Sequence, residues 1–182
     1  MKFYIQYLFG LFIILSHFFN DFKKSQKMSA EKRRARLMKE RRQLLLDPIE
    51  NVNVMWPDNC IDRLHVEITA PEDSLYHDDI FELDLTFNNG YPENAPRAVM
   101  TTPIFHPNID VSGAICVACL RTSYNQTVSV RKVIEEIIHA LRNPNPDDEL
   151  NMTAASMMKT DPKKFEATVR AQVTKNCLQR DA

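Results

Sequence analysis

The stretch RLHVEITAPEDSLYHDDIFELDLTFNNG, residues 63–90, contains two runs in which apolar and polar residues alternate. The apolar positions of these runs are Leu64, Val66, Ile68, Phe81, Leu83, Leu85 and Phe87. Because successive side chains of a strand point to opposite faces, a period of two predicts strands with one buried face. We therefore expect two half-buried strands of one antiparallel sheet.

The sequence on either side of these runs supplies two more strands. The turn Asn88-Asn89-Gly90 tolerates a positive φ, and residues 97–102 can return from it as a further strand. Residues 52–56 provide the first strand. Together the four runs predict a four-stranded antiparallel meander.

One helix is predicted before the sheet. Residues 29–46 lack Gly and Pro, and Leu37, Leu44 and Leu45 recur near helical spacing. The dipeptide Asp47-Pro48 ends this helix, because a residue before proline is disfavoured in the helical region. Its other face is strongly basic and carries Lys32, Arg33, Arg34, Arg36, Lys39, Arg41 and Arg42. Such a face either meets a partner or is solvated.

Three helices are predicted after the sheet. Ser129 caps a helix with an apolar stripe over residues 130–141, and Asn151 caps a short one that runs to Met158. The last helix starts at Asp161-Pro162 and runs to about Cys177. The order of elements indicates a single α+β domain, residues 28–182, with helices against one sheet.

Composition restricts the class of protein. The chain has 182 residues, of which 44% are hydrophobic and 26% charged, values typical of a globular protein and not of a disordered or fibrous one. Its formal net charge of -1 gives no reason to expect a nucleic-acid partner. Four cysteines are too few for a disulfide framework, which favours a reducing compartment.

Residues 1–27 do not belong to the predicted domain. The segment 3–19 is almost wholly apolar and has a length at the short end of what crosses a bilayer. As an anchor followed by lysines, it would hold the domain in the cytosol. The alternatives are a mistranslated leader, with Met28 as the true start, and a secretory signal, although no small-x-small cleavage site follows. Membrane contact is expected only if residues 3–19 are a real anchor.

A long irregular segment carries the candidate chemistry. Residues 103–125 lack periodicity over a length that an inert connection seldom has. Within it lie His106-Pro107-Asn108 and, eight residues after Asn108, Cys116. Cysteine is a strong nucleophile because a few per cent of it is thiolate at neutral pH. Cys116 could accept an acyl group while the Asn108 amide stabilises a tetrahedral oxyanion, an effect of about 2.7–4 kcal/mol.

Four motifs, in order, resemble those of ubiquitin-conjugating enzymes. They are Tyr91-Pro92-x-x-x-Pro96, Phe105-His106-Pro107-Asn108-Ile109, Gly113-x-Ile115-Cys116 and Pro144-Asn145-Pro146-Asp147-Asp148. The resemblance spans about residue 31 to the end of the chain. It implies an amino-terminal helix, a four-stranded antiparallel meander and three further helices, which agrees with the elements predicted above.

The resemblance also implies a reaction. An activating enzyme, having used ATP, would hand ubiquitin or a ubiquitin-like protein to Cys116 as a thioester, which a substrate lysine then attacks, usually with a ligase present. Asp148 would orient or deprotonate that lysine, and Asn108 would stabilise the oxyanion or hold the active-site loop. His106 would be structural, packed and hydrogen-bonded to the loop backbone. No bound cofactor or metal is implied, and the implied location is cytoplasmic or nuclear.

The chain departs from the family pattern at several places. Val117-Ala118-Cys119-Leu120 replaces the usual Leu-Asp-Ile-Leu, and Tyr124-Asn125-Gln126 replaces Trp-Ser-Pro. Glu93 stands where an aromatic residue is common. The positions of Glu93, Asn125 and Gln126 lie on the surface that binds RING-type ligases in the family. Because anchors of that kind carry much of an interface's energy, we expect weaker ligase binding, and with it a specialised partner or low activity.

Other functions remain open from the sequence. The pair Cys116-x-x-Cys119 could be a redox pair or half of a metal site, although a second pair for zinc is missing. A non-catalytic family variant could serve as a binding module, although Cys116, Asn108 and Asp148 are all retained. The modifier could be of the Nedd type, since Nedd-type conjugating enzymes resemble these motifs almost as well. Asp110 favours that interpretation, whereas Asp47-Pro48 and Thr101-Thr102-Pro103-Ile104 favour ubiquitin.

Overall fold

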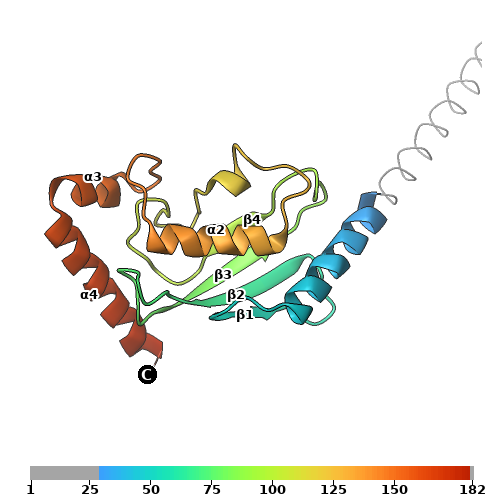
Figure 1. Ribbon diagram of the computed structural model, residues 1–182, viewed down its shortest axis with the longest axis horizontal. Coiled ribbons are helices and arrows are strands. Elements are labelled where there is room, and N and C mark those ends of the chain that lie inside the picture. The colour runs from blue at the N-terminus through green and yellow to red at the C-terminus, as the bar shows by residue number, and fades with distance from the viewer. Residues whose placement is uncertain (1–28, 181–182) are drawn as a thin grey trace, which may run out of the picture.

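An antiparallel sheet lies at the centre of the structure, a computed structural model that describes residues 29–180 (Figure 1). Its strands are β1 (Val52–Met55), β2 (Arg63–Thr69), β3 (Ile80–Thr86) and β4 (Arg97–Met100), and they are neighbours in sequence order. The predicted meander is therefore confirmed. Strand β4 ends two residues earlier than expected, at Met100, whose N–H donates to the Gly113 carbonyl at 2.8 Å.

The three helices after the sheet begin where the sequence predicted. A first helix spans residues 29–46, and α2 (Val130–Arg142), α3 (Met152–Thr160) and α4 (Pro162–Arg180) follow the sheet. The Ser129 hydroxyl accepts from the Lys132 N–H, and the Asn151 amide oxygen accepts from the Ala154 N–H. Helices α3 and α4 run two and three residues beyond their predicted ends. None of the helices within residues 29–180 is long and apolar enough to span a membrane, and the apolar segment 3–19 lies outside these residues.

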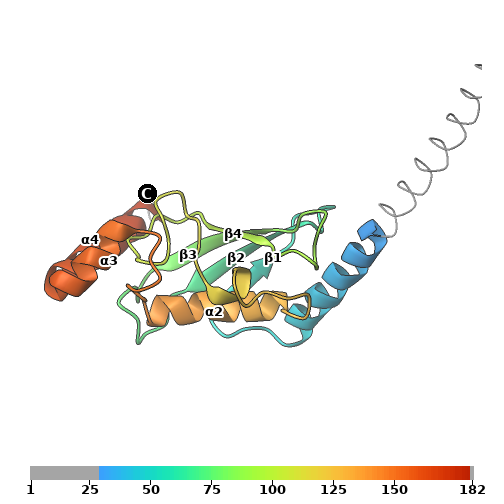
Figure 2. The ribbon, with the colours of Figure 1, turned by 90° about the horizontal axis from the view of Figure 1, so that it is seen from above.

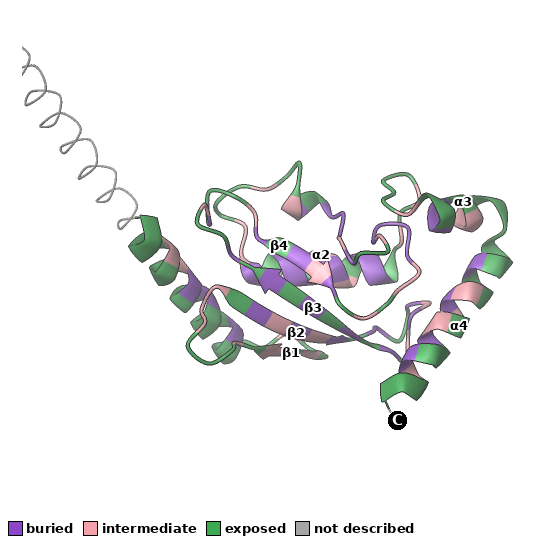
Figure 3. Ribbon diagram, turned by 180° about the vertical axis from the view of Figure 1, so that it is seen from behind, coloured by how far each residue is buried: buried purple, intermediate pink, exposed green. Residues whose placement is uncertain are grey.

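The core lies between α2 and one face of the sheet. Both Figure 1 and Figure 2 show α2 lying across that face, with the first helix near one end of the sheet and α3 and α4 near the other. The fully buried side chains of this layer include Val66, Leu83 and Leu85 of the sheet and Ile134, Ile137 and Leu141 of α2. Figure 3 shows the opposite face, where exposed positions alternate with buried ones along β3. The apolar side chains at every second position of the strands thus form the core, as predicted.

The first helix packs through a charged residue that the leucine pattern did not indicate. Leu37 and Leu44 are buried, but Leu45 is 65% exposed, so its predicted place in the apolar stripe is wrong. Glu40 is buried instead, and its carboxylate accepts from Arg36 Nε at 2.6 Å and from the Val130 N–H at 3.2 Å. Buried charge is stable only when paired and hydrogen-bonded, and both conditions hold here.

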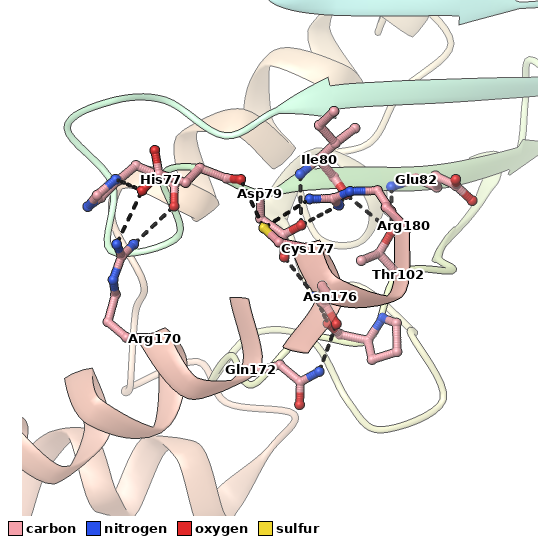
Figure 4. Close-up of polar contacts among 12 residues, drawn as sticks. His77, Asp79, Ile80, Glu82, Thr102, Arg170, Gln172, Asn176, Cys177 and Arg180 are labelled. Atoms are coloured by element: carbon pink, nitrogen blue, oxygen red, sulfur yellow. Dashed lines mark hydrogen bonds and ion pairs between the residues drawn. The ribbon is translucent and has the colours of Figure 1, made fainter. Parts of the chain in front are cut away.

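Helix α4 is attached to the sheet by a buried carboxylate, shown in Figure 4. Asp79, just before β3, is fully buried and accepts from Asn176 Nδ2 at 2.7 Å and from the Ile80 N–H at 2.8 Å. The same Nδ2 donates to the Pro103 carbonyl at 2.9 Å, and Arg180 forms an ion pair with Asp79. One amide thus connects α4 to β3 and to the start of the irregular segment.

We expect Asn176→Ala to lower the free energy of unfolding by about 2–3 kcal/mol, because the buried Asp79 carboxylate loses a donor and the Pro103 carbonyl loses its partner. Lys175→Ala, one residue away on the exposed side of α4, is the matched control and should change it by less than about 0.5 kcal/mol. Urea denaturation of both variants measures the difference. Equal effects would show that the amide does not support the fold.

Candidate active site

Backbone pairing within the irregular segment brings the two parts of the predicted site together. The Cys116 N–H donates to the Asn108 carbonyl at 2.9 Å, and the Asp110 N–H donates to the Ala114 carbonyl at 3.0 Å. The turn between them needs Gly113, which has φ of +80° and would place a Cβ 1.9 Å from the Met100 carbonyl oxygen. Cys116 and Asn108 are therefore neighbours, as the motif spacing suggested.

The ring of His106 joins this segment to α2. It is fully buried, Nε2 lies 3.0 Å from the Ala140 carbonyl oxygen of α2, and Nδ1 accepts from the Asn108 N–H at 2.9 Å. These partners require the neutral ring with its proton on Nε2. Burial lowers the pKa of His106 to about 4, so the ring is uncharged at neutral pH. The predicted structural environment of His106 is confirmed.

The side chain of Asn108 spans the gap to a second loop. It is 4% exposed, and Nδ2 donates to the carbonyls of Asn145 and Asp148, both at 2.8 Å. Its Oδ1 accepts from the Asn145 N–H at 2.8 Å. Both amide protons are therefore used within the protein. In this structure the side chain of Asn108 therefore joins its own segment to the loop that carries Asn145 and Asp148.

This connection places Asp148 beside Cys116. The Cys116 thiol donates to Asp148 Oδ2 at 3.4 Å, and the Asp148 side chain is 58% exposed. Only 3% of the Cys116 surface is exposed. Burial raises the pKa of the thiol, and the Asp148 carboxylate raises it further. All three predicted site residues thus meet in one place, with the carboxylate facing solvent and the sulfur covered.

A fourth residue, Arg121, reaches the sulfur with its charged group, and the sequence motifs did not identify it. Residues Ala118–Leu120 form a single turn of 3-10 helix, after which the Arg121 guanidinium folds back to donate to Cys116 Sγ. Arg121 also lies 3.6 Å from Asp148 Oδ1. This cation acts against burial and lowers the pKa of Cys116. The sequence offers one clue, a basic residue five positions after the cysteine. Only the structure shows that the turn directs its side chain back toward the sulfur.

Cys119 takes no part in this arrangement. It is 5% exposed within the hydrophobic core, and burial raises the pKa of its thiol to about 11. All four cysteines are free thiols. Within residues 29–180, no group of three His, Cys, Asp or Glu side chains could hold a metal ion. Cys119 therefore occupies the core as a small apolar side chain.

Comparison with known proteins relates the chain to one family. The family model described as ubiquitin-conjugating enzyme matches residues 36–173. Ubiquitin-conjugating enzyme E2 N of Macaca fascicularis is 34% identical over 136 residues, which cover 75% of this chain and 90% of that protein. Ubiquitin-conjugating enzyme E2 13 of Saccharomyces cerevisiae is 38% identical over 115 residues, 63% of this chain and 75% of that protein. NEDD8-conjugating enzyme Ubc12 of Arabidopsis thaliana is 32% identical over 123 residues, 67% of each chain.

The buried His106 predicts a loss of stability in mild acid. Its pKa is about 4 when folded and about 6.5 when unfolded, so the unfolded chain takes up a proton first as the pH falls. The contribution of the neutral His106 ring to the free energy of unfolding is complete above pH 6.5 and is lost progressively as the pH falls to 4. Between pH 7.5 and 5.0 we expect His106 to account for a fall of about 2 kcal/mol in the free energy of unfolding.

The comparison with His106→Gln isolates this effect, because the variant lacks only the His106 imidazole. Urea denaturation gives the free energy of unfolding of both proteins at pH 7.5 and pH 5.0. The difference between wild type and variant should be smaller by about 2 kcal/mol at pH 5.0 than at pH 7.5. A difference that does not change with pH would mean that His106 is not held neutral.

Proposed function

This chain belongs to the ubiquitin-conjugating enzyme family, and on that basis we propose that Cys116 carries ubiquitin or a ubiquitin-like protein as a thioester and passes it to a substrate lysine. The observation that supports this most is the contact of the Cys116 thiol with Asp148 at 3.4 Å. A covered thiol then lies beside an exposed carboxylate. The first can hold an acyl group, and the second can receive a cationic lysine.

The chemistry needs no cofactor on this chain. In the first step the Cys116 sulfur attacks the thioester carbonyl carbon of the modifier on the activating enzyme, a new C–S bond forms, and that enzyme's thiol leaves with the proton. In the second step a lysine nitrogen attacks the same carbon, an amide bond forms, and Cys116 leaves as a thiolate. ATP is consumed earlier, by the activating enzyme.

Asp148 and Asn108 serve the second step in different ways. The exposed carboxylate of Asp148 attracts the substrate ammonium and accepts its proton as the nitrogen attacks. Asn108 acts as a positioning residue: its two N–H bonds to the carbonyls of Asn145 and Asp148 keep that carboxylate next to the sulfur. Holding the carboxylate and the sulfur in a fixed geometry raises the rate of lysine attack without an additional catalytic group.

We propose ubiquitin as the modifier, with a NEDD8-type modifier as the second candidate. Two of the relatives above are named as ubiquitin enzymes and one as a NEDD8 enzyme, at identities between 32% and 38%. Asp110, the residue that favours the second candidate, uses its carboxylate internally by accepting from the Ser112 N–H at 2.7 Å and the Ala114 N–H at 3.0 Å. This internal use explains Asp110 without a role in modifier choice.

The surface expected to bind a ligase is held by the first helix. Lys32 Nζ lies 2.5 Å from Glu93 Oε1, and Arg36 donates to the Gln126 carbonyl at 2.9 Å. The Tyr124 hydroxyl donates to the Pro92 carbonyl at 2.8 Å, which joins the two loops. These loops present polar groups where an apolar anchor is usual in the family. We propose that the chain engages common RING ligases weakly and uses a partner suited to a polar surface.

We expect the full chain, incubated with activating enzyme, ATP and modifier, to form an adduct that a thiol reductant removes. Cys116→Ser should abolish the reducible adduct, because a serine could form only a reductant-resistant ester. Cys119→Ala, in the core close by, is the matched control and should keep it. Non-reducing electrophoresis with ubiquitin and with NEDD8 in parallel identifies the modifier. A reducible adduct that survives in Cys116→Ser would contradict the assignment.

We expect Glu93→Phe to tighten binding to a RING domain by about five- to tenfold, because it restores an apolar anchor. Glu72→Phe places the same aromatic on another exposed loop and should leave the affinity unchanged. Isothermal titration calorimetry with one RING domain measures all three proteins. An identical affinity for Glu93→Phe and wild type would show that this position does not limit ligase binding.

A further inference from the structure

The environment of Cys116 opposes the negative charge that the proposed reaction places on its sulfur. Burial and Asp148 both disfavour the thiolate, yet the thiolate is the attacking group in the first step and the leaving group in the second. Ala118, two residues after the cysteine, carries no charge. Among residues 29–180, the cationic group that contacts the sulfur is the Arg121 guanidinium.

Arg121 is well placed to act on that charge. Its guanidinium donates to Cys116 Sγ, while its ion pair with Asp148 Oδ1, at 3.6 Å, holds it over the sulfur. The 3-10 turn Ala118–Leu120 and its closing bond from the Arg121 N–H to the Ala118 carbonyl, 3.1 Å, fix the backbone from which the side chain folds back. The geometry is a triangle of thiol, carboxylate and guanidinium.

From this triangle we propose that Arg121 is a catalytic residue that stabilises the negative charge on Cys116 Sγ, both when the sulfur attacks and when it leaves. This inference rests on the proposed function of Cys116 and adds a residue to it. The charge-assisted N–H bond to sulfur strengthens as the S–H proton or the C–S bond is lost. In the second step the electron pair of the breaking C–S bond stays on sulfur, next to the guanidinium, while the lysine proton goes to Asp148 or water.

The proposal predicts opposite effects of the two neighbours on the same thiol. Removing the cation with Arg121→Ala should move the ionisation of Cys116 to higher pH by roughly 0.5–1 unit, a modest shift because the side chain is 53% exposed to solvent. Removing the anion with Asp148→Asn should move it to lower pH. A residue that only supported the loop would not produce shifts of opposite sign.

Iodoacetamide alkylation of the full chain between pH 6 and 11 tests this without modifier or partner enzymes. Mass spectrometry of the Cys116 peptide separates its rate from those of the other cysteines. At pH 7.5 we expect Arg121→Ala to react about three- to tenfold more slowly than wild type, with the difference narrowing as the pH rises. Arg121→Lys should recover part of the rate. Arg142→Ala, which removes an exposed arginine paired with Asp73 at 3.1 Å, is the control and should change nothing.

Two results would overturn the proposal. An unchanged midpoint in Arg121→Ala would show that the guanidinium does not act on the thiolate. Faster alkylation at every pH, with the same midpoint, would show that Arg121 only covers the sulfur. Because alkylation needs no thioester, these results do not depend on whether Cys116 can be loaded with a modifier. Single-turnover thioester formation at pH 7.5 then provides the second measurement, in which Arg121→Ala should be slower by the same factor as in alkylation.

Discussion

The Asn108 side-chain amide is the interaction on which the geometry of the active site depends. It is one link in a polar series that starts at the Ala140 carbonyl of α2, passes through the His106 ring and the Asn108 backbone, and ends at the Asp148 carbonyl. Each bond in the series is directional, and the two bonds of the His106 ring are buried, so each restricts the next. The position of α2 on the sheet therefore sets where the Asp148 carboxylate lies relative to the Cys116 sulfur.

The same principle holds the helices in place around the sheet. Glu40 connects the first helix to the start of α2, and Asn176 connects α4 to Asp79 and Pro103. Apolar packing supplies most of the driving force for folding, but it is not directional and would tolerate small slides of one element over another. Buried polar bonds lose their partners when an element slides, so they penalise such shifts. An active site assembled from two distant loops benefits from this rigidity, because its groups must stay within hydrogen-bond reach.

The sequence was sufficient for the elements but not for the polar groups that join them. Alternation and caps predicted the strands and the starts of the helices, because these features act over a few residues. The same reasoning placed Leu45 in the core and overlooked Glu40, since helical spacing alone does not say which charged residue will find a buried partner. The motifs predicted that Cys116, Asn108 and Asp148 belong to one site. They could not decide the environment of Asn108, whose partners lie 37 and 40 residues further along the chain, or find Arg121, whose direction depends on one short turn.

The electrostatics of the sulfur fit a carrier better than a general nucleophile. A thiol that is 3% exposed, with its pKa raised by burial and by Asp148, is weakly ionised at rest and reacts slowly with stray electrophiles. A carrier gains from this, because its sulfur must react only when a partner brings a carbonyl carbon to it. The same burial would also make the sulfur a poor leaving group. A cation on the solvent side of the sulfur resolves the conflict, since it stabilises the charge that forms during transfer while the thiol at rest stays covered.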